Sequence, residues 1–199
     1  MKIYLDIETL PADGEILDLV KTTYENLIKD KKIKKTTFEE YHRATSFNGD
    51  FGRIYCIAYA INDEKVKVLT GDEKEILTKF WQIAQSVKIF IGHNIMEFDL
   101  PFIYKRSIIH NVKPSQNLFF ARYRNDPIYD TMREWNKWSS NLTSLDRLAK
   151  IFKITSSKDI MKGSEVYDYY LKNQHSLVYK YCQKDVEVTR NVYKKLNFL

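Results

Sequence analysis

The first ten residues alternate between apolar and polar side chains, and this alternation constrains the fold more than any other feature of the chain. The apolar positions are Ile3, Leu5 and Ile7, and the positions that alternate with them are Tyr4, Asp6 and Glu8. A period of two is typical of a β-strand, in which successive side chains point to opposite faces. We therefore expect a strand with one apolar face and with Asp6 and Glu8 side by side on the other.

Two neighbouring carboxylates on one face of a strand repel each other, and a divalent cation between them makes the arrangement favourable. The alternative is a strand whose polar face, with Tyr4, Asp6 and Glu8, is simply solvated. The string Asp-x-Glu is common and recurs at Asp185 and Glu187, so taken alone it favours the solvated face. The metal interpretation depends on whether distant parts of the chain supply matching partners.

The composition is that of a globular protein. The chain has 199 residues, which suggests one domain, and its hydrophobic fraction of 44% is ample for a core. No apolar run approaches the roughly 20 residues that span a bilayer, and Asp6 and Glu8 interrupt any signal peptide. Cys56 and Cys182 form neither a disulfide framework nor a zinc-site spacing, so we expect a cytoplasmic protein without a membrane partner.

Basic side chains outnumber acidic ones by 32 to 26, for a formal net charge of +6. A modestly basic protein with carboxylates at a candidate site is suited to bind a polyanion together with its metal ions. The charge also fits a protein that is merely soluble.

The segment after the first strand is predicted to be helical. Apolar residues at helical spacing indicate a helix over about 15–29, and Thr36 or Thr37 followed by Glu39 or Glu40 resembles the capping box of a second, short helix. A lysine-rich run over 29–35 lies between them, which is usually a solvated loop but could contact phosphates. We interpret residues 11–50 as a helical insertion, within a single domain over 1–199, that covers or flanks the first strand.

The rest of the chain alternates strands and helices. The predicted strands are 53–61, 65–69, 87–91 and 128–131, and the helices include 74–85, 142–152 and 176–196. The first three strands suggest an antiparallel meander, and the order of elements fits a mixed α/β sheet. A helix is also expected to begin at Phe98-Asp99-Leu100-Pro101, where Asp99 suits an N-cap. The same position follows the carboxyl end of a strand, where ligands of open α/β sheets lie.

Residues 119–138 interleave basic and aromatic side chains. Rings that stack on bases, beside cations that contact phosphates, suit a nucleic-acid single strand. Packing of the rings in the core is the commoner explanation, so this segment only supports the functional interpretation.

The last predicted helix carries a carboxylate among its apolar residues. Leu177, Tyr181 and Val188 share one side of this helix, and Asp185 lies on the same side. A carboxylate that faces the core is unfavourable unless it is paired or bound to a cation. A lysine or arginine could satisfy it, and the spacing Tyr-x-x-x-Asp also occurs at 59–63.

These acidic features stand in a recognisable order along the chain. The segments are Leu5-Asp-Ile-Glu-Thr9, then Gly92-His-Asn94 with Phe98-Asp99, and finally Tyr181-Cys-Gln-Lys-Asp185. Together they resemble the DEDD superfamily of 3′→5′ exonucleases, in the subgroup whose third motif is Tyr-x-x-x-Asp. The pattern is most similar to the proofreading domains of family B DNA polymerases and their stand-alone relatives. The sister subgroup has histidine where this chain has Lys180, so that version does not fit.

The resemblance implies a ribonuclease-H-like α/β fold, with a mixed sheet of about five strands flanked by helices. It also implies phosphodiester hydrolysis with two divalent metal ions, Mg²⁺ or Mn²⁺, and hard oxygen ligands suit both ions. The implied roles are that Asp6 contacts both ions, Glu8 and Asp185 complete the first, Asp99 acts through bound water, and Tyr181 orients or helps to deprotonate the attacking water. A tyrosine with its ordinary pKa near 10 is better suited to orienting the water than to deprotonating it.

Four further residues match family positions near the substrate. Thr9 and Leu10 match positions that touch the terminal nucleotide, and Asn94 and Phe98 match positions beside the scissile end. The expected substrate is a single-stranded DNA 3′ end, released as nucleoside 5′-monophosphates, with a polymerase or repair protein as a partner. The alternatives are an RNA exonuclease resembling ribonuclease D, an inactive module that only binds nucleic acid or protein, and a plain α/β domain whose matches are accidental.

Overall fold

The computed structural model describes residues 1–34, 36–156 and 160–199, and a five-stranded mixed sheet forms its centre. The strands are β1 (Lys2–Leu10), β2 (Arg53–Ile61), β3 (Lys67–Thr70), β4 (Ile89–Gly92) and β5 (Ile128–Asp130), in the order β3-β2-β1-β4-β5. β1, β2 and β3 pair antiparallel, as the meander predicted, whereas β4 and β5 add parallel to β1. The expected mixed α/β sheet is confirmed, and β1 lies in its middle.

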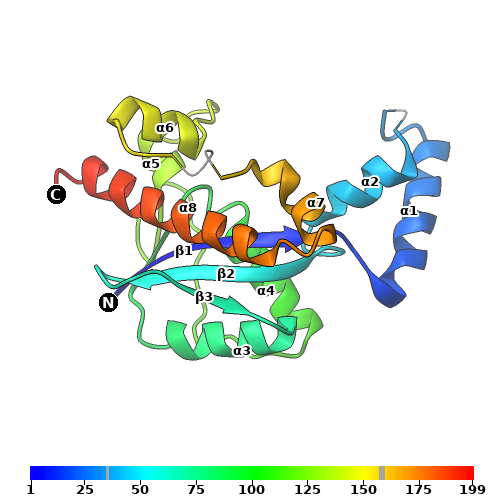
Figure 1. Ribbon diagram of the computed structural model, residues 1–199, viewed down its shortest axis with the longest axis horizontal. Coiled ribbons are helices and arrows are strands. Elements are labelled where there is room, and N and C mark those ends of the chain that lie inside the picture. The colour runs from blue at the N-terminus through cyan, green and yellow to red at the C-terminus, as the bar shows by residue number, and fades with distance from the viewer. Residues whose placement is uncertain (35, 157–159) are drawn as a thin grey trace.

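Helices cover both faces of this sheet (Figure 1). On one face lie α3 (Glu73–Ala84) and α4 (Asp99–Ile109), and on the other lie α6 (Leu145–Phe152), α7 (Val166–Leu171) and α8 (His175–Leu196). The short helix α5 (Thr131–Asn136) follows β5 directly. Among the described residues, no helix combines the length and the apolar character that crossing a membrane requires.

The alternation in β1 sorts its side chains between these two layers. Ile3, Leu5 and Ile7 are buried in the core on the side of α3 and α4. Tyr4 is buried in the second core, against α8. α8 lies over the polar face of β1, where Glu8 is 9% exposed and Asp6 is half-buried, so this face is covered rather than simply solvated.

The segment between β1 and β2 forms an arm that projects beyond one end of the sheet (Figure 1). It contains the 3₁₀ turn η1 (Gly14–Ile16), α1 (Leu17–Lys29), α2 (Phe38–Ala44) and the 3₁₀ turn η2 (Thr45–Phe47). The ring of Tyr24 joins α1 to α2 through Phe38, with 5.6 Å between ring centroids, and the predicted capping box is present at Thr37 and Glu40. Lys35, in the predicted basic run, lies outside the described residues.

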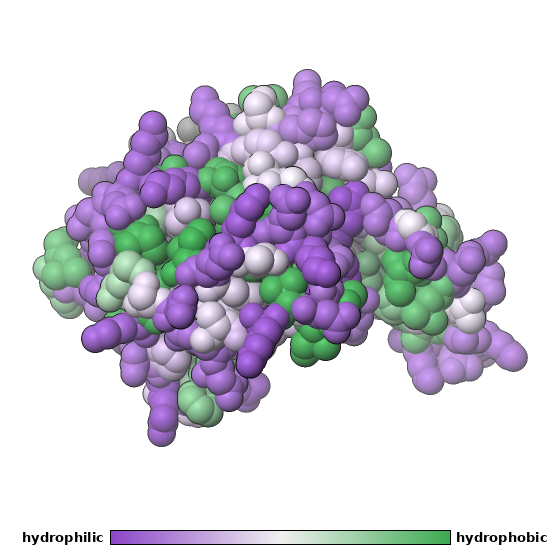
Figure 2. All heavy atoms as spheres, turned by 90° about the horizontal axis from the view of Figure 1, so that it is seen from below, coloured by the Kyte–Doolittle hydropathy of each residue, from purple (hydrophilic) through white to green (hydrophobic). Residues whose placement is uncertain are grey.

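The arm buries little of its own apolar surface. Val20 is the buried residue of α1, whereas Leu19 is 53% exposed. Figure 2 shows the arm standing out at the right, with apolar side chains grouped between hydrophilic ones. That residues 11–50 are an insertion into a single domain stays a prediction.

Candidate active site

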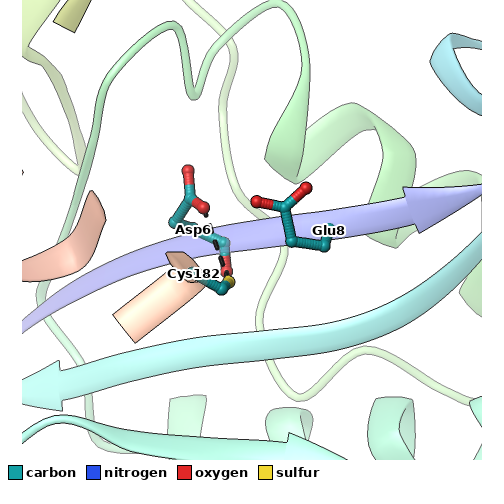
Figure 3. A group of neighbouring side chains, drawn as sticks. All are labelled: Asp6, Glu8 and Cys182. Carbon is teal, nitrogen blue, oxygen red and sulfur yellow. Dashed lines mark hydrogen bonds between the residues drawn. The ribbon is translucent and has the colours of Figure 1, made fainter. Parts of the chain in front are cut away.

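The site begins on β1, where Asp6 and Glu8 lie side by side and face α8 (Figure 3). One carboxylate oxygen from each of them and the Sγ atom of Cys182, from α8, all lie within 4.8 Å of one another. The Cys182 thiol donates to the Oδ2 atom and the backbone oxygen of Asp6, both at 3.5 Å. β1 therefore presents two carboxylates to the same space, as its alternation predicted.

Asp99 reaches the same strand from α4. The prediction that Asp99 is an N-cap is wrong: Phe98 is the N-cap residue and Asp99 is the first residue of α4. Its Oδ1 atom accepts a hydrogen bond from the backbone N–H of Ile7 at 3.1 Å. That donor is free because β4 pairs with β1 only as far as Tyr4. Asp99 is 3% exposed, and its carboxyl group contacts the peptide bond that joins Asp6 to Ile7.

Tyr181 and Asp185 enter from α8, one helical turn apart, and are 3% and 7% exposed. The pKa of Tyr181 lies well above its usual value, chiefly because the phenol is buried and also because Asp185, Glu8 and Asp6 are negatively charged. The phenol oxygen also lies beside the 3₁₀ turn η3 (Gly163–Glu165), since a Cβ atom built on Gly163 would be 3.8 Å from it. The phenol stays protonated at neutral pH.

The carboxyl groups raise one another's pKa values. The pKa of Asp6 is well above its usual range, first because the group is buried and then because Asp185 and Asp99 are negatively charged. Burial raises the pKa of Asp99 to about 7, with smaller contributions from Asp130 and Asp185, although two backbone N–H groups oppose the shift. A cluster of mutually repelling oxygen donors is the arrangement that a hard divalent cation stabilises.

The donor set at this site suits Mg²⁺ or Mn²⁺ better than a soft metal. The ligand atoms are carboxylate oxygens, which hard cations prefer. Burial raises the pKa of the Cys182 thiol well above its usual value, so the thiol stays protonated and acts as a hydrogen-bond donor. Asp6, Glu8, Asp99 and Asp185 therefore fit a site for divalent ions.

A cavity of about 510 Å³ opens next to these carboxylates, and Asp6 and Asp185 form part of its wall. The rest of this wall includes His93, Lys162 and Lys150, and Lys150 pairs with a third acidic residue of the wall, Asp146, at 2.8 Å. Burial lowers the pKa of His93 to about 4, and the Nε2 atom of this neutral ring lies 2.9 Å from the backbone oxygen of Thr143. Lys162 brings positive charge to this acidic pocket, whereas the charge of Lys150 is offset by Asp146.

Sequence reasoning did not identify His93, Lys150 or Lys162 as lining residues. They come from three separate segments, which only the folded chain brings together. The sequence held one signal for His93: it lies inside Gly92-His-Asn94, directly after β4, in a segment already matched to the exonuclease pattern.

The four predicted substrate-binding residues lie in different environments. The hydroxyl of Thr9 donates to the backbone oxygen of Ser46 at 2.6 Å, and Thr9 lines a second cavity of about 310 Å³ between η2 and α7. Leu10 is fully buried, so its side chain could support the wall of a site only from beneath. Asn94 has a left-handed backbone with φ of 63°, and its N–H donates to Asp130 at 3.0 Å. Phe98 is half-buried.

A small aromatic pair stands near these residues, and the sequence analysis did not include one member of it. The Phe47 ring, from η2, is 68% exposed, and its centroid lies 6.4 Å from that of Phe98. Phe47 also lines the cavity that contains Thr9. No sequence motif marked Phe47, because it reaches the site from the otherwise undiagnostic segment 11–50.

The fold and the site define a class. A mixed five-stranded sheet flanked by helices, with acidic side chains converging on its central strand, is the α/β ribonuclease-H-like exonuclease fold. A family model described as "Predicted 3'-5' exonuclease related to the exonuclease domain of PolB" matches residues 47–199, and the chain belongs to this family. The match begins after β1, so it includes Asp99, Tyr181 and Asp185 but neither Asp6 nor Glu8.

The chain is also similar to part of a protein that is named as a polymerase. A protein named DNA polymerase from Archaeoglobus fulgidus is 24% identical over 157 residues, which is 72% of this chain and 20% of the polymerase. The chain thus spans about a fifth of the length of that relative.

Proposed function

We propose that this protein is a 3′→5′ exonuclease of the tyrosine DEDD subgroup, which hydrolyses single-stranded DNA ends to nucleoside 5′-monophosphates with two divalent metal ions. The observation that carries the proposal is that carboxyl groups from three separate elements, β1, α4 and α8, meet around the middle of β1, close enough to raise one another's pKa values. The polymerase relative supports DNA as the substrate and a polymerase or repair protein as a partner. A cytoplasmic location would suit this activity.

Asp6, Glu8, Asp99 and Asp185 would hold the ions. When bound, two Mg²⁺ or Mn²⁺ ions supply a water of lowered pKa and neutralise charge on the leaving 3′ oxygen. The hydrogen bond from Ile7 to Asp99 fixes one carboxylate in place before substrate arrives. Lys162 would attract the phosphates of the strand into the cavity.

Tyr181 would orient the attacking water through its phenol oxygen. Because its pKa is raised, the hydroxyl keeps its proton at neutral pH and cannot act as a strong base. Thr9, Asn94 and Phe98 would contact the terminal nucleotides, and Leu10 would support Thr9 from within the core.

Replacing Tyr181 with phenylalanine is expected to lower kcat by roughly 10- to 100-fold and to leave KM close to wild type, because the orienting hydroxyl is lost. The same hydroxyl hydrogen-bonds to Asp185, so the melting temperature should fall slightly. Steady-state hydrolysis of a labelled oligonucleotide measures kcat and KM. Tyr170→Phe is the matched control, since the Tyr170 hydroxyl accepts a hydrogen bond from Arg53 at 3.2 Å, outside the acidic cluster. An unchanged kcat for Tyr181→Phe would remove Tyr181 from the proposed machinery.

The test of the function is digestion of matched DNA and RNA oligonucleotides, labelled at the 5′ end, with Mg²⁺, with Mn²⁺ and with EDTA. We expect a ladder that shortens from the 3′ end of DNA, release of nucleoside 5′-monophosphates, and no reaction in EDTA. A ladder confined to RNA would support an enzyme resembling ribonuclease D instead. Binding of both strands without hydrolysis under any metal would support an inactive nucleic-acid-binding module.

A further inference from the structure

The connection between α4 and β5 exposes an unusual set of side chains. Phe119, Phe120 and Tyr123 are 69%, 43% and 75% exposed, although large aromatic residues are normally covered in a folded protein. Arg122 and Arg124, which alternate with Tyr123, are also exposed. We call these five residues the 119–124 surface.

The 119–124 surface is anchored to the body of the protein. The ring of Phe120 packs edge-on against Tyr104 of α4, with 5.8 Å between centroids, and the Tyr104 hydroxyl accepts the backbone N–H of Leu118 at 2.9 Å. The ring of Tyr123 contacts the half-buried ring of Trp138, with centroids 5.2 Å apart. The rings of Phe120 and Tyr123 therefore stand on fixed supports.

The backbone at this contact is held in an unfavourable conformation. Tyr123 and Trp138 have φ angles of 64° and 62°, in the left-handed region that bulky residues rarely adopt. Such strain persists where the surrounding structure imposes it, and it is concentrated at functional sites. Here it keeps the Tyr123 ring against Trp138 and leaves most of that ring in solvent.

The positive charge of this surface is available to a ligand. Among the described residues, neither Arg122 nor Arg124 forms a salt bridge, whereas Arg133 nearby in the chain pairs with Glu97 at 3.3 Å. Two unpaired guanidinium groups next to exposed rings complement a strand that offers both phosphates and flat bases. An aliphatic protein partner would not need the guanidinium groups, so a nucleic acid fits the surface better.

The 119–124 surface lies close to the candidate active site along the chain. Trp138, which supports Tyr123, is five residues before Thr143, whose backbone oxygen contacts His93 in the wall of the 510 Å³ cavity. Five residues span at most about 18 Å. A stacked strand covers that distance in about five nucleotides, at about 3.4 Å each.

We propose that the 119–124 surface binds the single strand upstream of its 3′ end, with bases stacked on Phe119 and Tyr123 and phosphates on Arg122 and Arg124. The inference rests on the proposed exonuclease function, because it assumes that a 3′ end occupies the acidic cavity. It implies that substrates longer than about five nucleotides gain affinity that a trinucleotide cannot gain.

The test compares two double variants, Phe119→Ala with Tyr123→Ala and Arg122→Gln with Arg124→Gln. Binding of a fluorescein-labelled oligothymidylate of about 16 nucleotides is measured by anisotropy in EDTA, where no hydrolysis occurs. Loss of the rings should weaken binding by about fivefold or more per ring. Loss of the guanidinium groups should reduce the slope of log K against log salt by about 0.7 for each phosphate contact.

The specific readout is substrate length. With Mg²⁺, both double variants should hydrolyse a trinucleotide with wild-type kcat and KM, because that substrate is too short to reach the surface. The control is Leu19→Ala with Lys21→Gln on α1, whose side chains are likewise exposed but lie on the projecting arm. The control should bind the longer strand as wild type does.

Two outcomes would overturn the inference: unchanged binding of the longer strand by both double variants, or an equal loss on the trinucleotide and the longer strand. Failure of the proposed exonuclease function can be distinguished from failure of this inference. If the wild-type protein hydrolyses no strand under either metal, the anisotropy measurements still decide whether the 119–124 surface binds one.

Discussion

Asp6→Asn is expected to lower kcat/KM for a single-stranded oligonucleotide by about 10³-fold or more at millimolar Mg²⁺, since several kcal/mol of transition-state stabilisation depend on the ions it holds. Asp6 is the residue that faces all the other groups of the site: Asp99 and Asp185 raise its pKa, and Cys182 donates to its Oδ2 atom. An amide at this position keeps the shape and an acceptor for the thiol but removes the charge. Steady-state hydrolysis of a labelled oligonucleotide measures the loss.

The same substitution should not weaken the fold. Because burial and neighbouring acids raise the pKa of Asp6, its ionisation disfavours the folded state at neutral and higher pH, and asparagine avoids that penalty. In EDTA we expect the variant to melt at or above the wild-type temperature. Asp63→Asn is the matched control, because Asp63 pairs with Lys194 at 2.6 Å on the surface and should keep full activity. Wild-type hydrolysis by Asp6→Asn would show that another site performs the reaction.

The spacing of polar and apolar residues within single elements was enough to predict how the acidic side chains of β1 and α8 are oriented. The period of two in β1 placed Asp6 and Glu8 on one face, since side-chain direction in a strand follows from position alone. The helical spacing of α8 likewise placed Asp185 on the buried side, one turn from Tyr181. The mixed sheet followed from the order of elements, because parallel strands need a connecting helix and antiparallel ones do not.

The features that could not be predicted from the sequence depend on where the strands and helices end and which segments pack against those ends. The N-cap prediction for Asp99 was wrong because its carboxyl group instead accepts from the N–H of Ile7, which is free only where β4 stops pairing with β1. Leu10 was assigned to the substrate, yet it is fully buried, and no local pattern shows that this end of β1 is covered. A β-bulge also shifts the register of β1 and β2 between Glu8 and Thr9. Such contacts form between segments far apart in the chain, so periodicity does not report them.

The metal-free protein is expected to lose stability as the pH rises from about 4 to about 7, the interval between the ordinary pKa of an aspartate and the raised pKa of Asp99, and Mn²⁺ should restore it. Burial and neighbouring acids hold the pKa of Asp99 at about 7 and that of Asp6 well above its usual range. The folded chain therefore binds more protons than the unfolded chain, and stability falls as the pH rises through these pKa values. Each group that ionises contributes up to about 1.4 kcal/mol per pH unit.

Divalent ions compete with these protons, so Mn²⁺ affinity should rise by about tenfold per pH unit for each proton it displaces. Thermal melting with and without millimolar Mn²⁺, between about pH 5 and 8, should show a shift that grows with pH. His93, whose pKa burial lowers to about 4, has the opposite effect, but only below its unfolded value of about 6.5. Asp99→Asn should flatten the metal-free curve, since its amide oxygen can still accept from Ile7. A Mn²⁺ shift of equal size at both ends of the range would mean that the ion binds elsewhere, because carboxylates with ordinary pKa values near 4 have already lost their protons over most of it.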